Sequence, residues 1–191
     1  MLSEAKGRQI MQAALNTFLQ HGYKGTSMDR VAREAGVSKQ TVYSHYRDKK
    51  GLFTALVAHL SEKLFPPELL TVPAEAEPGA LLRTMARAYV DALGTWEHTA
   101  FNRLVLAESP RFPELGEIYL RKAVEPGLNM IVAYLQQHRE LAISDPEATA
   151  RAFFSALSSF AIGRELLQEK YLMPMDTDRL IKVLVHMITK L

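Results

Sequence analysis

The residues best suited to recognition chemistry lie in one short segment, KQTVYSHYRDKK, at positions 39–50. In a helix, which turns by about 100° per residue, Val42 and Tyr46 share one face and form the inner side. The other face carries neutral hydrogen-bonding side chains, namely those of Gln40, Thr41, Tyr43 and Ser44. Such groups suit base edges and phosphate oxygens better than they suit a protein core. The segment therefore predicts a nucleic-acid surface.

A cationic group follows directly on this segment. Asp48 is a good N-cap for a further helix that opens with Lys49 and Lys50. An exposed helix N-terminus that carries two cations binds phosphate through its dipole, its free N–H groups and its charge together. Beside Lys49, we expect His45 to contact phosphate rather than to pack in the interior.

The segments before position 39 have the spacing needed to hold this helix. Residues 4–21 carry apolar side chains at helical spacing, and Gly22 follows as a natural terminator. Thr26 is expected to cap a second short helix, which Gly36 ends. Ser38 then caps the helix that carries the polar face, after a turn of only about three residues. Two short helices joined in this way predict a helix-turn-helix.

The rest of the chain also has the periodicity of helices. Apolar residues from Leu52 to Leu64 predict a long fourth helix, and residues 67–79 form a linker rich in proline and glutamate. Pro126 is expected to kink or break the helical segment that contains it. Further helices are predicted at about 80–96, 99–109, 128–138, 146–170 and 177–190. The fold class is therefore all-α, with an N-terminal three-helix helix-turn-helix domain and a C-terminal helical bundle.

The last two of these helices are apolar around much of their circumference, which indicates burial on two sides. One side can be the chain's own core, and a second copy of the chain is the simplest source of the other. We therefore expect a homodimer. Its interface is predicted at Phe153, Leu157, Phe160, Leu184 and Ile188.

Composition limits the partners and the compartment. The net charge of +2 conceals a first fifty residues with nine basic and four acidic side chains, a charge of +5, and a remainder of −3. This asymmetry indicates that only the N-terminal segment meets a polyanion. The chain has no cysteine, no apolar signal core and no run of about 18 apolar residues. We expect a cytoplasmic protein that does not interact with a membrane.

These features resemble one known family. The run GYKGTSMDRVAREAGVSKQTVYSHYRDKKGLF is similar to the DNA-binding segment of TetR-type transcriptional regulators, over about residues 5–55. The later run FNRLVLAESPRFPELGEIYLR resembles the C-terminal domain of the AefR-like and AcrR-like members. The resemblance implies a DNA-binding domain at 1–50, a connecting helix at 48–65, and an effector-binding and dimerisation domain at 51–191.

The resemblance also implies which residues meet DNA. In such regulators the helix after the turn enters the major groove, and the lysine that opens the fourth helix grips a phosphate. Gln40 departs from the family pattern, in which small residues are common at this position. The implied DNA-binding residues are Thr26, Ser27, Lys39, Gln40, Thr41, Tyr43, Ser44, His45 and Lys49.

An effector pocket in the C-terminal bundle is a further implication of the resemblance. Taken singly, the two tyrosines among the candidates are better explained as core residues, and Arg103 with Glu108 as a surface pair. The candidate ligand-binding residues are Tyr89, Trp96, Arg103, Glu108, Tyr119 and Asn129.

No cofactor, metal or catalytic residue is predicted. The six histidines do not cluster at ligand spacing, and no nucleophile elbow or Gly-rich phosphate loop is present. The sequence thus predicts a dimeric repressor that binds a palindromic double-stranded DNA operator and is released by a small-molecule effector. The alternatives are a helical enzyme or small-molecule carrier with an incidental basic segment, and a DNA binder without an effector.

Overall fold

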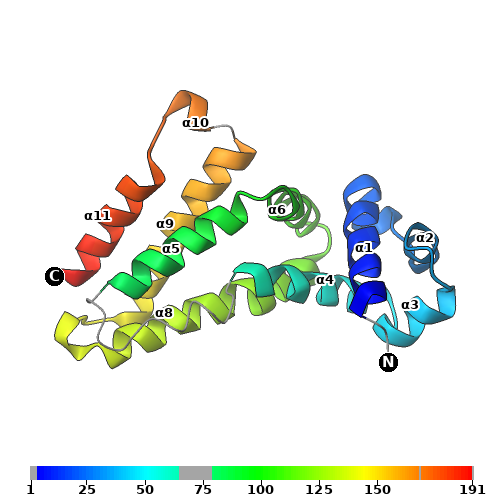
Figure 1. The fold of residues 1–191 in the computed structure, drawn as a ribbon, viewed down its shortest axis with the longest axis horizontal. Helices are drawn as coiled ribbons and strands as arrows, with labels where there is room; N and C mark the ends of the chain where they lie inside the picture. Colours follow the sequence, from blue (N-terminus) through cyan, green and yellow to red (C-terminus); the bar gives the residue numbers. More distant parts are fainter. Residues whose placement is uncertain (1–3, 65–78, 168, 191) are drawn as a thin grey trace. The chain divides into compact units, whose positions relative to one another are not determined.

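The computed structural model describes residues 4–64, 79–167 and 169–190, and all regular structure in these ranges is helical (Figure 1). The predicted all-α class is confirmed. The chain divides into two compact units, the first formed by Met1–Ser61 with Ala100–Ala123 and the second by Glu62–Thr99 with Val124–Leu191. The linker predicted at 67–79 lies outside the described residues except for Gly79.

The first unit holds the helix-turn-helix and part of the C-terminal sequence. Its helices are α1 (Glu4–Gly25), α2 (Met28–Glu34), α3 (Lys39–Tyr46), most of α4 (Lys49–Leu64), most of α6 (Trp96–Glu108), α7 (Pro113–Tyr119) and most of the π-helical turn η2 (Leu120–Val124). The second unit holds α5 (Ala80–Leu93), α8 (Glu125–Gln137), the 3-10 turn η3 (Arg139–Leu141), α9 (Pro146–Leu166), α10 (Glu169–Leu172) and α11 (Thr177–Thr189).

Local chemistry sets the helix starts in the first unit. The Ser38 hydroxyl accepts from Thr41 N–H at 3.1 Å, and the Asp48 carboxylate accepts from Gly51 N–H at 2.7 Å. Both caps are as predicted. The expectation for Thr26 is wrong, because the neighbouring Ser27 caps α2 instead.

The Thr26 side chain points into the first unit. Its hydroxyl donates to the carbonyls of Thr17 at 3.2 Å and Gly22 at 2.8 Å. Gly22 has φ 65° and ψ 178°, so the backbone leaves helical geometry inside α1. A positive φ at this position favours glycine, because glycine has no Cβ that would clash in this conformation. The helix terminator predicted at Gly22 is therefore a kink within α1. The hydrogen bonds of the Thr26 hydroxyl stabilise this kink.

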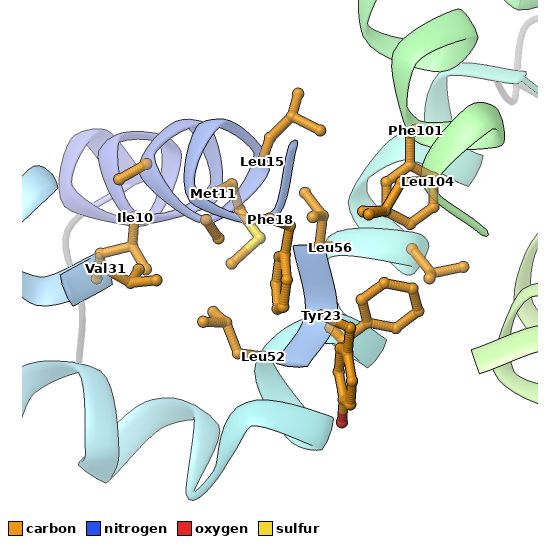
Figure 2. Packing of buried hydrophobic residues seen from close by; sticks show 14 of the residues in the cluster. Ile10, Met11, Leu15, Phe18, Tyr23, Val31, Leu52, Leu56, Phe101 and Leu104 are labelled. Carbon is orange, nitrogen blue, oxygen red and sulfur yellow. The ribbon is translucent and has the colours of Figure 1, made fainter. Parts of the chain in front are cut away.

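An aromatic cluster holds the two sequence segments of the first unit together (Figure 2). The ring of Phe53 in α4 lies 5.4 Å from that of Phe101 in α6, and 5.7 Å from that of Tyr23. Tyr23 also lies 5.1 Å from Phe112, in the loop before α7. Phe18 completes the cluster with an edge contact to Phe53. Residues 100–123 are therefore part of the same core as the N-terminal helices.

The second unit has its own core between α5, α8, α9 and α11. Asp145 caps α9, since its carboxylate accepts from Ala148 N–H at 3.0 Å. Gly79 is the N-cap residue of α5 and has φ 93°. Its N–H donates to the Tyr134 hydroxyl at 3.0 Å. A Cβ at this glycine would lie 2.7 Å from a methyl carbon of Val185 on α11, so the backbone approaches that helix closely.

The chain passes Pro126 without a gap in helical structure. The residues just before it, Leu120–Val124, form the wider π-helical turn, and Pro126 occupies the first turn of α8. A proline has no N–H to give, and a first turn needs none. The predicted break is thus a change of helix type.

Candidate nucleic-acid interface

Helix α3 presents the polar face that its sequence predicts. Val42 is fully buried and Tyr46 is half-buried against the core of the first unit. The opposite side chains are exposed, and they belong to Gln40, Tyr43, Ser44 and His45. Tyr43 has 47 % of its surface exposed, a large value for an aromatic residue. The structure therefore brings four of the predicted DNA-binding side chains together on one accessible surface.

A tight turn fixes α3 relative to α4. Arg47 has φ 62° and ψ −58°, and Asp48 N–H donates to the Tyr46 carbonyl at 2.7 Å. These values describe a γ-turn with positive φ, a rare and strained conformation for a residue other than glycine. Gly51 makes the turn possible, because a Cβ there would collide with the Tyr46 carbonyl oxygen.

Lys49 opens α4, and its ammonium is held by backbone. Nζ donates to the carbonyls of Tyr23 at 2.7 Å and Lys24 at 3.3 Å, and lies 4.6 Å from the centroid of the Tyr23 ring. Partial burial lowers the pKa of Lys49, and the nearby Glu108 carboxylate opposes this by raising it. The predicted phosphate-binding lysine is therefore a fixed charge rather than a free side chain.

The remaining predicted DNA contacts are already engaged within the chain. Lys39 pairs with Asp29 across the surface. The Thr41 hydroxyl lies 2.8 Å from that of Ser38, and Ser27 accepts from Arg30 N–H at 3.3 Å. Thr26 is buried, so its hydroxyl is not available at the surface.

Further basic side chains of the first unit are exposed, and among them only Lys50 was part of the predicted phosphate site. Lys24, Arg30, Arg33, Arg47 and Lys50 are all exposed and all belong to the first unit. The Arg30 guanidinium donates to the Gly25 carbonyl at 3.2 Å, which places this cation beside the start of α2. Their charge could have been read from the sequence, but their exposure could not.

The candidate ligand-binding residues are divided between the two units. Tyr89, Trp96 and Asn129 lie in the second unit, whereas the other candidates belong to the first. Tyr89 is buried, with its hydroxyl 2.9 Å from that of Ser158 and its ring 4.7 Å from that of Phe154. Trp96, Arg103 and Asn129 are exposed.

Glu108 and Tyr119 each make a contact that sequence reasoning missed. The Glu108 carboxylate accepts from Tyr23 N–H at 3.2 Å, across 85 positions of sequence. The Tyr119 hydroxyl donates to the buried Asn102 amide oxygen at 2.8 Å, and burial raises the pKa of Tyr119 to about 12. Neither contact has a signal in residue spacing, because both depend on how α6 and α7 fold back.

Most of the residues predicted for a dimer interface face the core of their own chain. Phe153, Leu157, Phe160 and Ile188 are buried in the second unit, and Leu184 is partly buried against the same core. They have little surface left for a second chain. The exposed large apolar side chains of α11 are Val183 and Met187, and further ones follow α9 at Leu167, Tyr171, Leu172, Met173 and Met175.

No helix among the described residues is long and apolar enough to cross a membrane. No group of three or more histidine, cysteine or acidic side chains in the described ranges could hold a metal ion.

Family comparisons account for both units. Residues 10–56 match the model of the bacterial regulatory proteins of the tetR family. Residues 80–191 match the model of the AefR-like transcriptional repressor C-terminal domain. The two matches overlap the first and second sequence runs on which the resemblance rests.

Individual proteins agree with the family models. The chain is 27 % identical over 157 residues to the uncharacterised HTH-type regulator YhgD of Bacillus subtilis, covering 78 % of each chain. It is 31 % identical over 125 residues to the HTH-type transcriptional repressor SCO4008 of Streptomyces coelicolor, covering 62 % of each.

Solved structures extend the likeness to the whole chain. A TetR-family protein of Mesorhizobium loti superposes with a TM-score of 0.75 at 28 % identity, covering 98 % of this chain and 96 % of its own. The flavonoid-responsive regulator FrrA does so with a TM-score of 0.71 at 28 % identity, covering 98 % and 97 %. The protein is thus a member of the TetR family of DNA-binding transcriptional regulators, with an AefR-like C-terminal domain.

Proposed function

We propose that this regulator is a cytoplasmic repressor that binds a palindromic operator as a homodimer and is not an enzyme. The outer face of α3 carries the proposal, because Gln40, Tyr43, Ser44 and His45 are exposed together on a helix whose inner side is fixed. One such helix from each copy would enter successive major grooves about one helical turn apart. The name of the relative SCO4008 supports repression rather than activation.

Within this proposal, residues 1–50 carry the DNA contacts and residues 51–191 carry the effector and dimer contacts. Gln40 is a natural bidentate partner for adenine, and the hydroxyl and imidazole groups beside it suit phosphate or a second base. Lys49 supplies a phosphate contact from the start of α4. The two copies would associate through α9 and α11, whose exposed apolar residues include Val183 and Met187.

Selection of bound fragments from the genomic DNA of the source organism, at physiological salt, tests the DNA-binding part. We expect enrichment of fragments that share an inverted repeat, and an affinity that falls steeply with salt because phosphate contacts release counterions. Enrichment without a repeat, or binding that salt does not change, contradicts the proposal. A reporter driven by the recovered fragment should rise when the gene is deleted, and a fall would indicate activation.

An effector is expected to bind in the C-terminal part and to favour a conformer whose two α3 helices no longer match the operator. The helix α4 is a covalent route for this effect, because it belongs to the first unit up to Ser61 and to the second from Glu62. FrrA is described as flavonoid-responsive, so flavonoids are the first compounds to test. By linkage, a compound that weakens operator binding must itself bind more weakly to the operator complex, by the same factor. A compound that binds without changing operator affinity is not the effector.

A further inference from the structure

A single residue, Tyr23, connects the C-terminal sequence to the lysine that opens α4. Its N–H donates to the Glu108 carboxylate at 3.2 Å, and its carbonyl accepts from Lys49 Nζ at 2.7 Å. Its ring lies beneath the same ammonium at 4.6 Å. All three residues belong to the first unit, so these contacts lie within one compact body. The peptide groups of Tyr23 are thus held from both sides by side chains of opposite charge.

The kink at Gly22 explains why Tyr23 needs an acceptor from elsewhere. In a regular helix an N–H bonds to the carbonyl four residues earlier. The non-helical ψ of 178° at Gly22 turns the next peptide out of that pattern. A Cβ at Gly22 would collide with Glu108 Oε1, so only glycine lets the carboxylate come this close. The kink and the carboxylate therefore fit each other.

Lys49 occupies a defined position as a result. Two of the three donors of its ammonium are directed at the carbonyls of Tyr23 and Lys24. The third remains for a phosphate oxygen at the N-terminus of α4, beside the turn from α3. A long lysine side chain loses considerable rotamer freedom when it is fixed. Here that loss occurs on folding, before DNA arrives.

We propose that Glu108 is a positioning residue of the DNA-binding site, which acts through the Tyr23 peptide on Lys49. This inference rests on the proposed function. It assigns to a residue of the AefR-like domain, which spans 80–191, a direct part in arranging the DNA-contacting segment. Without the carboxylate, the Tyr23 peptide would lose its acceptor, and the carbonyl that orients Lys49 would move with it.

The test measures the affinity for a duplex recovered by genomic selection, as a function of salt, for three substitutions of Glu108. Glu108→Gln keeps an acceptor oxygen at the same reach and should bind within about twofold of the original chain. Glu108→Asp keeps the charge but is shorter by one methylene, and Glu108→Ala keeps neither. Both should lose about three- to tenfold in affinity. The slope of log Kd against log salt should fall by about the amount that one phosphate contact contributes.

The sign of the change in DNA affinity distinguishes a positioning role of Glu108 from a purely electrostatic one. Removal of an acidic side chain near a polyanion should tighten binding, so a loss of affinity in Glu108→Ala opposes that effect. Glu114→Ala is the matched control, because Glu114 is a part-exposed acid of the same unit that also acts electrostatically on Tyr23. This control should bind as well as the original chain or slightly better.

A double-mutant cycle with Lys49→Ala completes the test. If Glu108 acts through Lys49, Glu108→Ala should add no further loss in the Lys49→Ala background. Additive losses, or Glu108→Asp binding like the original chain, would overturn the proposal. Circular dichroism and thermal melts identify any variant that fails to fold. If Glu108→Ala does not fold, the DNA affinities of Glu108→Gln and Glu108→Asp still decide whether Glu108 is a positioning residue. Failure of the proposed function would look different from failure of this inference, because the original chain would then enrich no DNA fragment.

Discussion

Helices α3 and α11 each bury one face and expose the other, yet their exposed faces differ in kind. On α3 the outward side chains hydrogen-bond, and Tyr43 is the one large aromatic among them. On α11 they include Val183 and Met187, with 45 % and 58 % of their surface exposed. Exposed polar groups hydrogen-bond to water, and they lose free energy of solvation unless a polar partner replaces that water. Exposed methyl groups, in contrast, are stabilised when they are transferred out of water. The first face suits a nucleic acid, and the second suits another apolar surface.

The two faces also differ in how they are held. The end of α3 is fixed by the strained turn at Arg47 and by the close approach of Gly51 to the Tyr46 carbonyl. Helix α11 is held by side-chain packing, with Ile181 and Val185 buried in the second unit. Base recognition requires placement to a fraction of an ångström, whereas apolar association tolerates small shifts. Backbone geometry is accordingly the more tightly specified at α3.

The largest effect is expected from charge on the apolar face. The double substitution Val183→Glu with Met187→Glu should weaken self-association at least 100-fold, or about 3 kcal/mol, because unpaired carboxylates would be buried on association. Analytical ultracentrifugation measures the dimer constant. Gln136→Glu with Gln137→Glu is the control, since it adds two charges to exposed positions at the end of α8. An unchanged dimer constant in the first variant would remove this face from the interface.

A smaller loss is expected from the turn that holds α3. Gly51→Ala should lower the free energy of unfolding by about 2 kcal/mol, because the new Cβ meets a backbone oxygen that cannot move freely. Gly36→Ala is the matched control, since Gly36 has φ 63° but no atom within 4 Å of a Cβ. It should lose only about 1 kcal/mol, for backbone conformation alone. Equal losses in urea denaturation would show that the close approach at Gly51 has no special cost.

A change on the polar face should affect recognition and leave stability alone. Gln40→Ala should weaken binding to the selected duplex by about 1–2 kcal/mol, roughly tenfold, through loss of contacts to a base. The salt slope should remain the same, because no phosphate contact is removed. Fluorescence anisotropy at several salt concentrations measures both quantities. If the slope falls while sequence preference is retained, Gln40 contacts phosphate instead.

The smallest expected effect is a gain. Arg47→Gly should raise the free energy of unfolding by about 1 kcal/mol, because glycine adopts the positive φ at Arg47 with little strain. Urea denaturation of the two chains provides the comparison. A loss of stability would mean that the Arg47 side chain contributes more to the fold than its backbone strain costs.

The sequence was most informative where structure is local. Ser38 and Asp48 were predicted as caps and act as caps, because a cap depends on a few neighbouring residues. Thr26 shows the limit of the same reasoning. Two hydroxyl residues stand side by side at this helix start, and contacts with the Thr17 and Gly22 carbonyls decide which of them turns inward.

Long-range features of the site could not be predicted. The exposed polar face of α3 follows from periodicity, but the bond from Glu108 to Tyr23 joins residues 85 positions apart. Periodicity also marked α9 and α11 as apolar nearly all round. It could not tell which apolar side chains their own core would use, and Phe153, Leu157 and Ile188 proved to be buried within one chain.

The aromatic cluster of the first unit has a consequence for protein engineering. A chimaera made by exchanging only the first sixty residues between relatives would separate Phe53 from Phe101 and Tyr23 from Phe112. Such an exchange should yield poorly soluble protein, whereas one that also transfers residues 100–123 should not. The exchangeable part of this regulator is therefore discontinuous in its gene, and recombination at one crossover point cannot move it intact.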